Sequence, residues 1–164
     1  DRCFSMSRFI TRFADVVKIP EPHLVPVNLN DLVFSCKRFM EGMCADRNIT
    51  ITLDIDEELG EVKLDVALFE QVLVNIIKNA AESIEQNGEI KIRTYSPGGI
   101  EVADNGKGIT KETEAKLFSP FFSTKPNGQG IGLIFIREVL MRHGCSFSLR
   151  TYTDGWTRFR MLFN

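Results

Sequence analysis

The sequence predicts an α+β protein, a two-layer α/β sandwich in which a mixed, mostly antiparallel sheet packs on helices, preceded by an N-terminal helix. Three observations carry this prediction. Segments with helical periodicity are interspersed with segments whose apolar residues alternate, as in half-buried strands. Short turns join neighbouring strand candidates, so the sheet cannot be purely parallel. Each long helix candidate has one apolar stripe, which suits packing on one face of a sheet.

The composition limits the class of protein. The chain has 164 residues, 43% hydrophobic and 26% charged, which suits one globular domain with a full core. Its net charge is −2 and its Lys and Arg residues are scattered, so nucleic-acid binding is not favoured. No apolar run reaches the length of a membrane span, and the N-terminus lacks a signal-peptide pattern.

The cysteines and histidines do not form a recognisable reactive motif. The four cysteines lie far apart without a C-x-x-C pair, so we expect buried free thiols in a reducing cytoplasm. His23 lies beside prolines, and His143 closes a helix candidate. Neither histidine has the spacing of a metal ligand or of a catalytic triad member.

The chain opens with a helix candidate. Residues 4–17 place apolar side chains at helical spacing, and the pattern stops at the proline-containing segment 19–22. Such a stripe needs a partner helix, so we expect a piece cut from a longer protein. We therefore divide the chain into residues 1–22 and a domain at 23–164.

The next elements alternate between helices and strands. Asn28, with Asp31 three residues on, is typical of an N-cap, and the helix that follows runs to about Ala45. The remaining candidates are strands 49–55 and 60–64, helix 66–86, strands 89–95 and 100–103, helices 110–117 and 131–143, and strands 146–152 and 156–163.

The longest helix candidate carries a polar arc opposite its apolar face. Asn75 and Asn79, at i and i+4, point the same way from this arc. Taken alone, the arc reads as an ordinary solvated face.

Two glycine-broken segments follow this helix, at 102–109 (VADNGKGI) and 127–133 (NGQGIGL). Each lies where a strand or loop meets a helical pattern, which is how a chain brings bare backbone close to a phosphate or a ring. The asparagine pair lies upstream, and the Phe-rich segment 118–126 (FSPFFSTKP) lies between them. Together these features predict a nucleotide site, although a D-x-G-x-G segment alone is equally typical of a hairpin or Asx turn.

The order of these motifs resembles the N box, first glycine box, F box and second glycine box of sensor histidine kinases. These kinases belong to the GHKL superfamily, with DNA gyrase, the ninety-kilodalton heat-shock chaperone and the MutL repair protein. The resemblance covers about residues 26–164 and implies the Bergerat fold. Residues 1–22 resemble the end of the helical dimerisation hairpin that carries the phospho-accepting histidine, with its linker. The residues at 19–22 and 121–126 resemble those of nitrogen-regulation-type kinases.

The resemblance implies a site for ATP and Mg²⁺. Asp104 accepts a hydrogen bond from the adenine amine, Asn79 is the magnesium ligand, and Lys125 contacts the terminal phosphate. The implied nucleotide-binding set is Asn75, Asn79, Asp104, Gly106, Gly108, Ile109, Phe118, Thr124, Lys125, Gly128, Gly130, Ile131, Gly132, Leu133 and Thr157. The open alternatives are an exposed loop lysine at 125 and ordinary core packing for Phe118.

The implied catalytic residues are Lys125 and Asn75. Asn75 stands where hydrolytic members of the superfamily carry a glutamate base, and an amide cannot take a proton at neutral pH. This favours phosphoryl transfer over hydrolysis. The sequence departs from the family at Gln129, Ile131 and Glu82, and it contains no accepting His-Glu-x-x-x-Pro motif.

These inferences together predict the ATP-binding catalytic domain of a bacterial two-component sensor histidine kinase. It would phosphorylate a histidine on the hairpin of the same protein, for relay to the receiver domain of a response regulator. The parent is expected to be a homodimer with this domain in the cytoplasm, and a membrane anchor is left open. The alternatives are an ATPase that couples hydrolysis to conformational change and a non-catalytic ATP-sensing module.

Overall fold

A computed structural model of the chain describes residues 19–118 and 130–164. The helix expected at 4–17, and the predictions for Thr124, Lys125 and Gly128, lie outside these residues. The helices and strands are β1 (Val25–Asn28), α2 (Leu29–Asp46), β2 (Ile49–Asp54), β3 (Glu61–Leu64), α3 (Val66–Ile84), β4 (Gly88–Tyr95), β5 (Gly99–Asp104), α4 (Lys111–Glu114), α5 (Gly130–Arg142), β6 (Cys145–Thr151) and β7 (Thr157–Phe163).

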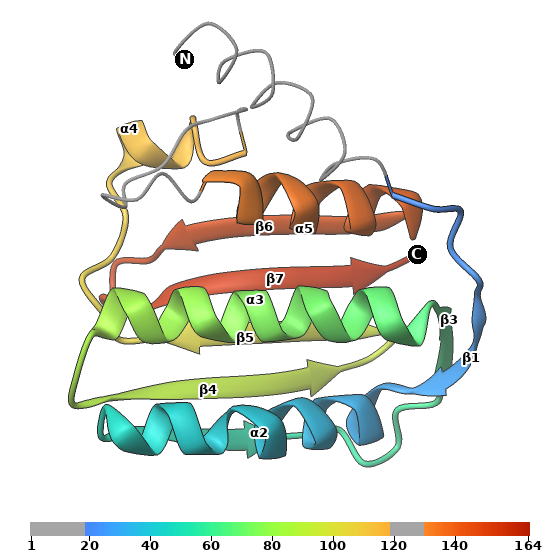
Figure 1. Ribbon diagram of the computed structural model, residues 1–164, viewed down its shortest axis with the longest axis horizontal. Helices are drawn as coiled ribbons and strands as arrows, with labels where there is room; N and C mark the ends of the chain where they lie inside the picture. The colour runs from blue at the N-terminus through green and yellow to red at the C-terminus, as the bar shows by residue number, and fades with distance from the viewer. Residues whose placement is uncertain (1–18, 119–129) are drawn as a thin grey trace, which may run out of the picture.

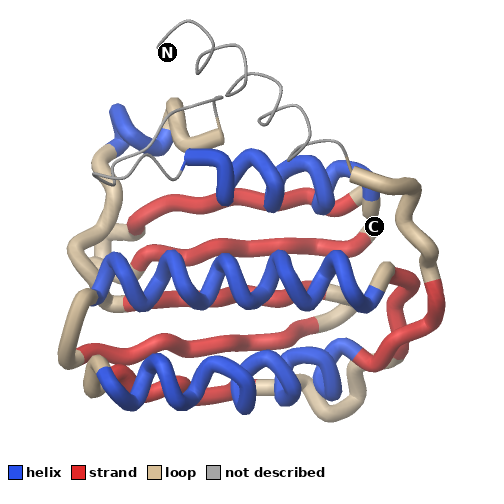
Figure 2. Tube along the Cα trace, viewed as in Figure 1, coloured by secondary structure: helices blue, strands red, loops and turns tan. Residues whose placement is uncertain are grey.

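The main sheet has five strands in the order β2-β4-β5-β7-β6. β2 runs parallel to β4, and the other neighbouring pairs are antiparallel. The three long helices α2, α3 and α5 all cover one face of this sheet (Figure 1). Coloured by secondary structure, the helical layer lies in front of the strands with no helix behind them in the part of the chain that is described (Figure 2). The predicted mixed, mostly antiparallel two-layer fold is confirmed.

Side-chain N-caps mark the starts of helices α2 and α3. Asn28 accepts a hydrogen bond from the Asp31 N–H at 3.1 Å, as the sequence predicted. Asp65 accepts from the Leu68 N–H at 3.1 Å and starts α3. Phe69 and Ile77 on α3 are fully buried, so this central helix is fixed against the sheet.

The structure corrects the segment before the first described helix. The sequence predicted no strand between the proline-containing segment 19–22 and the cap at Asn28, yet Val25–Asn28 forms β1, paired antiparallel with β3. Pro26 is compatible with this strand because β1 has a single neighbour, so the missing N–H costs no ladder bond on its free side. The strand expected at 60–64 therefore belongs to a separate two-stranded sheet.

His143 and three cysteines have structural surroundings. The Nε2 atom of His143 accepts the Asp65 N–H at 3.0 Å, and Nδ1 lies 2.8 Å from the Val139 carbonyl oxygen. The imidazole thus ties the end of α5 to the start of α3. Cys36, Cys44 and Cys145 are buried free thiols, as expected. Within residues 19–118 and 130–164, no helix has the length and apolar character that crossing a membrane requires.

Candidate nucleotide-binding site

Asp104 is a buried carboxylate at the end of β5. It is 5% exposed, and its Oδ1 accepts the Gly106 N–H at 2.9 Å. Burial raises its pKa from 3.8 to about 6, partly offset by hydrogen bonds from Gly106 and Ser83. No Lys or Arg among the described residues forms an ion pair with it. The fold therefore holds a desolvated acceptor that has no cation beside it among the described residues.

The glycine turn after Asp104 packs on the last turn of α3. A Cβ atom at Gly106 would lie 2.6 and 2.7 Å from the carbonyl carbon and oxygen of Ser83. The Lys107 N–H donates to the same oxygen at 3.3 Å. Gly108 has φ +81°, a backbone conformation that side chains disfavour. The fold itself thus requires both glycines, whatever the turn binds.

Two threonines complete the row of strand ends beside Asp104. Thr157, the first residue of β7, is directly opposite Asp104 and is 4% exposed. Thr151, the last residue of β6, is opposite Thr157 on its other side, with the two Oγ1 atoms 2.7 Å apart. Thr151 Oγ1 also accepts the Ile109 N–H at 2.7 Å. Sequence reasoning found Thr157 and missed Thr151, whose only signal was a polar residue ending a strand.

The asparagine pair lies on α3, which packs against β5 and α5. Asn75, Asn79 and Ser83 occupy successive turns of one helix face, because they are four residues apart. Ser83 touches the Asp104 turn, so this face leads from the buried carboxylate back along the helix. Both asparagines are half-buried, unlike the fully solvated side chains of the alternative interpretation.

A cavity of about 850 Å³ opens between α2, α3 and α5. Its lining includes Asn75 and Val74 on α3, Phe39 on α2, and Gly132 and Phe135 on α5. The structure therefore brings the first asparagine and the second glycine segment to one hollow. Apart from a few polar side chains such as Asn75, the lining of this cavity is mostly apolar.

Two residues of the predicted nucleotide set have core contacts. Phe118 lies edge-to-face against Phe147 and Phe159, with ring centroids 5.4 and 6.2 Å apart. Leu133 is half-buried against the main core. These contacts support the core-packing alternative for Phe118. A role of either residue toward a nucleotide stays a prediction.

The donor set suits magnesium carried by a nucleotide. Within the described ranges, no three His, Cys, Asp or Glu side chains gather into a metal site. Mg²⁺ bound to phosphates keeps several waters and takes only one or two protein oxygens. The amide oxygen of Asn79, one turn from Ser83, fits such a limited role.

Comparison with known proteins agrees with this geometry. Residues 64–164 match the family described as histidine kinase-, DNA gyrase B-, and HSP90-like ATPase. Sensor histidine kinase ZraS of Salmonella typhimurium is 28% identical over 150 residues, which cover 89% of this chain and 32% of the relative. Signal transduction histidine-protein kinase AtoS of Escherichia coli is 34% identical over 121 residues, covering 71% and 20%. The chain thus spans a third or less of these relatives.

A solved structure extends the agreement to three dimensions. The catalytic domain of histidine kinase ThkA superimposes with a TM-score of 0.75 at 31% identity, covering 86% of this chain and 96% of that domain. The family match, the sequence identity and the structural superposition all lead to one assignment. The chain belongs to the histidine kinase-, DNA gyrase B- and HSP90-like ATPase family, as a catalytic domain of the sensor histidine kinase type.

Proposed function

We propose that residues 23–164 bind Mg-ATP and deliver its terminal phosphoryl group to a histidine on a helical hairpin of the same, longer protein. A response regulator receiver domain then takes the phosphoryl group. The observation that carries this proposal is Asp104, a buried carboxylate at the end of β5 that has no cation partner within residues 19–118 and 130–164. A fold retains such a costly group most readily where a ligand satisfies it.

The base specificity follows from the chemistry of this acceptor. An ionised carboxylate only accepts hydrogen bonds, so it suits the exocyclic amine of adenine. Guanine presents a carbonyl oxygen at the same position, which would be repelled. The site therefore selects adenine over guanine.

The phosphates are assigned to the helical layer. The α5 helix begins at Gly130, and its free N–H groups and positive dipole end favour phosphate oxygens. Asn79 would hold Mg²⁺, which neutralises charge on the phosphates, and Lys125 would contact the terminal phosphate. Gly106, Gly108, Ile109, Gly128, Gly132 and Thr157 would shape the rest of the site.

The choice between transfer and hydrolysis rests on Asn75. Its amide cannot remove a proton from water, so an attacking water is not activated there. The cavity beside Asn75 leaves room for an incoming imidazole. Transfer then depends on positioning and on charge neutralisation.

The partners and the setting extend this proposal. ThkA, the relative with the 31% identical catalytic domain, has been solved in complex with a response regulator protein, TrrA. We extend that pairing to the parent of this chain, as a homodimer joined through its hairpin. The domain would work in the bacterial cytoplasm, and a membrane anchor would belong to other parts of the parent.

The test combines the purified chain with a hairpin domain that carries the histidine and with γ-labelled ATP. Wild type is expected to label the hairpin, and Asp104→Asn is expected not to. Asn75→Glu should raise phosphate release relative to transfer. Gln86→Glu, at an exposed position just after α3, is the control for the added charge.

Release of phosphate by the wild type without hairpin labelling would instead support an ATPase. ATP binding without either product would support a sensing module. Equal hydrolysis by wild type and Asn75→Glu would overturn the role given to Asn75.

A further inference from the structure

Thr151 contacts three segments around the candidate site, two through its side chain and one through its backbone N–H. Its Oγ1 accepts the Ile109 N–H of the glycine turn at 2.7 Å and lies 2.7 Å from Thr157 Oγ1. Its own N–H donates to Glu114 Oε2 at 2.9 Å, at the end of α4. Thr151 therefore contacts both the turn after Asp104 and the threonine opposite Asp104.

The 2.7 Å contact between the hydroxyls allows either threonine to donate, and the surrounding groups favour one direction. A threonine hydroxyl has one proton and accepts up to two hydrogen bonds. If Thr151 donates to Thr157, the donors run in one direction, from the Ile109 amide through both hydroxyls toward the Asp104 side. In that direction each hydroxyl accepts one bond and donates one, so each bond polarises the next. The negative charge of Asp104, opposite Thr157 in the register, favours this direction.

We propose that Thr151 is a positioning residue that fixes the donor direction of the Thr157 hydroxyl and thereby sets purine specificity. This inference rests on the ATP site proposed above. Thr151 itself does not touch the nucleotide. It accepts the N–H of the glycine turn and donates to Thr157, so the Thr157 proton faces away from Thr151, toward the space beside Asp104 where the base would bind.

The resulting pair of groups is complementary to one purine edge. Asp104 accepts and Thr157 donates, side by side at the ends of β5 and β7. Adenine offers an amine donor next to the ring N1 acceptor, which satisfies both groups. Hypoxanthine offers a carbonyl acceptor next to an N1–H donor, which opposes both. A site built from buried polar groups rejects such a reversed ligand because the groups remain unpaired.

A purely packing role for Thr151 makes the opposite prediction. The Cγ2 methyl of Thr151 would lie 3.2 Å from a Cβ placed at Gly108, so the methyl fills space beside the turn. Valine keeps this methyl and lacks the hydroxyl. Serine keeps the hydroxyl and lacks the methyl. The two variants therefore separate hydrogen bonding from packing.

The experiment measures dissociation constants for ATP and inosine triphosphate with Mg²⁺ by calorimetry. Thr151→Val is expected to reduce the preference for ATP over inosine triphosphate by roughly fivefold to tenfold, mainly through weaker ATP binding. Thr151→Ser should stay within about twofold of wild type. Thr153→Val is the matched control, because Thr153 is exposed on the adjoining turn.

The outcomes are distinct. A Thr151→Val protein that keeps the wild-type preference, or a Thr151→Ser protein that loses it, overturns the inference while the ATP site stands. If Thr151→Val does not fold, Thr151→Ala, which also lacks the hydroxyl, is compared with Thr151→Ser by the same criterion. A wild type that binds no ATP overturns the inference together with the proposed function.

Discussion

Two buried carboxylates on β5 have opposite electrostatic surroundings. Asp104 and Glu101 are 5% and 7% exposed, yet the pKa of Asp104 is raised to about 6 while the pKa of Glu101 is lowered. They lie an odd number of positions apart on one strand, so they face opposite sides of the sheet. Asp104 lies beside the helical layer, at the candidate site. Glu101 lies on the face that has no helix in the described part of the chain.

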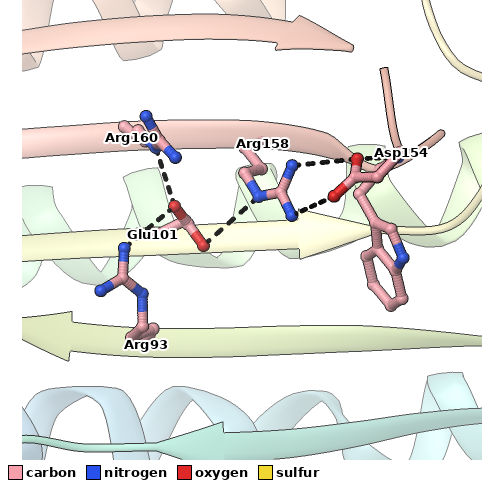
Figure 3. A network of polar contacts seen from close by, with 6 residues as sticks. Arg93, Glu101, Asp154, Arg158 and Arg160 are labelled. Carbon is pink, nitrogen blue, oxygen red and sulfur yellow. Dashed lines mark hydrogen bonds and ion pairs between the residues drawn. The ribbon is translucent and has the colours of Figure 1, made fainter. Parts of the chain in front are cut away.

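Arginines account for the difference. Glu101 Oε1 accepts from Arg160 Nε at 2.8 Å and from Arg93 at 3.3 Å, and Arg158 Nε lies 3.7 Å from Oε2 (Figure 3). Burial by itself raises the pKa of Glu101, and the hydrogen bonds from Arg160 and Arg93 outweigh it. Arg158 also binds Asp154 through both terminal nitrogens, at 3.2 and 2.7 Å.

The comparison shows which buried acid is available for a ligand. Glu101 has its partners within the fold, so its charge stabilises cross-strand pairing. Asp104 has two hydrogen-bond donors and, in the part of the chain that the structure describes, no cation, so its charge costs stability until something else binds it. Burial alone does not distinguish a structural acid from a functional one; the surrounding cations do.

Removing the charge of Asp104 should have the largest effect. Asp104→Asn is expected to weaken ATP binding roughly 100-fold, because a charge-assisted hydrogen bond to the adenine amine is lost. The folded pKa lies above the unfolded 3.8, so ionised Asp104 destabilises the fold at pH 7. The variant should therefore gain about 1 to 3 kcal/mol in free energy of unfolding.

Calorimetry and urea denaturation measure both changes. Asp54→Asn, at the exposed end of β2, is the control. Unchanged ATP binding by Asp104→Asn would remove the distinction between the two acids.

Neutralising Glu101 should lower stability and leave ATP binding almost unchanged. Glu101→Gln is expected to lower the free energy of unfolding by about 1 to 3 kcal/mol, because three arginines lose their shared partner. ATP affinity should change by less than about twofold, since the site is on the other face. The folded pKa of Glu101 is lowered, so its stabilisation is present above pH 4.5 and is lost below it.

Urea denaturation at pH 7 and at lower pH tests this, with the exposed Glu57→Gln as control. A stability loss no greater than that of the control would contradict the structural role of Glu101.

The glycine turn beside Asp104 should tolerate no side chain. Gly106→Ala is expected to lower the free energy of unfolding by about 1 to 3 kcal/mol, because the new methyl meets the backbone of Ser83 and the turn must shift. ATP binding should weaken with it. Gly60→Ala is the control, since a Cβ there meets nothing within 4 Å. Thermal unfolding compares the two, and equal melting temperatures would refute the close contact.

The smallest effect concerns pH. With a pKa of about 6, Asp104 is mostly ionised at pH 7 and mostly protonated at pH 5, so its acceptor strength is lost on acidification. ATP affinity relative to Asp104→Asn should fall about tenfold between these values. The variant corrects for the titration of the phosphates, and a constant ratio would contradict the assigned pKa.

Much of the fold could be predicted because its signals are local. Apolar side chains at helical spacing gave α2 and α3, and the cap at Asn28 needed only its neighbour Asp31. The polar strand end at Asp104 and the glycine turn after it are also readable from spacing. The positions of Asp104, Gly106, Asn75 and Thr157 were therefore available in advance.

Other features depended on which strands meet. The pairing of β1 with β3 and the parallel alignment of β2 with β4 join segments far apart in the chain. The role proposed for Thr151 likewise depends on its contacts with Thr157 and Ile109, which only the folded structure brings together.

The sequence by itself determined most of the helices and strands, the family and the candidate adenine acceptor. Only the tertiary structure decided that, among the described residues, Glu101 is surrounded by arginines while Asp104 is not. The physical reason is that a pKa depends on burial and on charges brought close by strand register, and neither is encoded in the spacing of neighbouring residues.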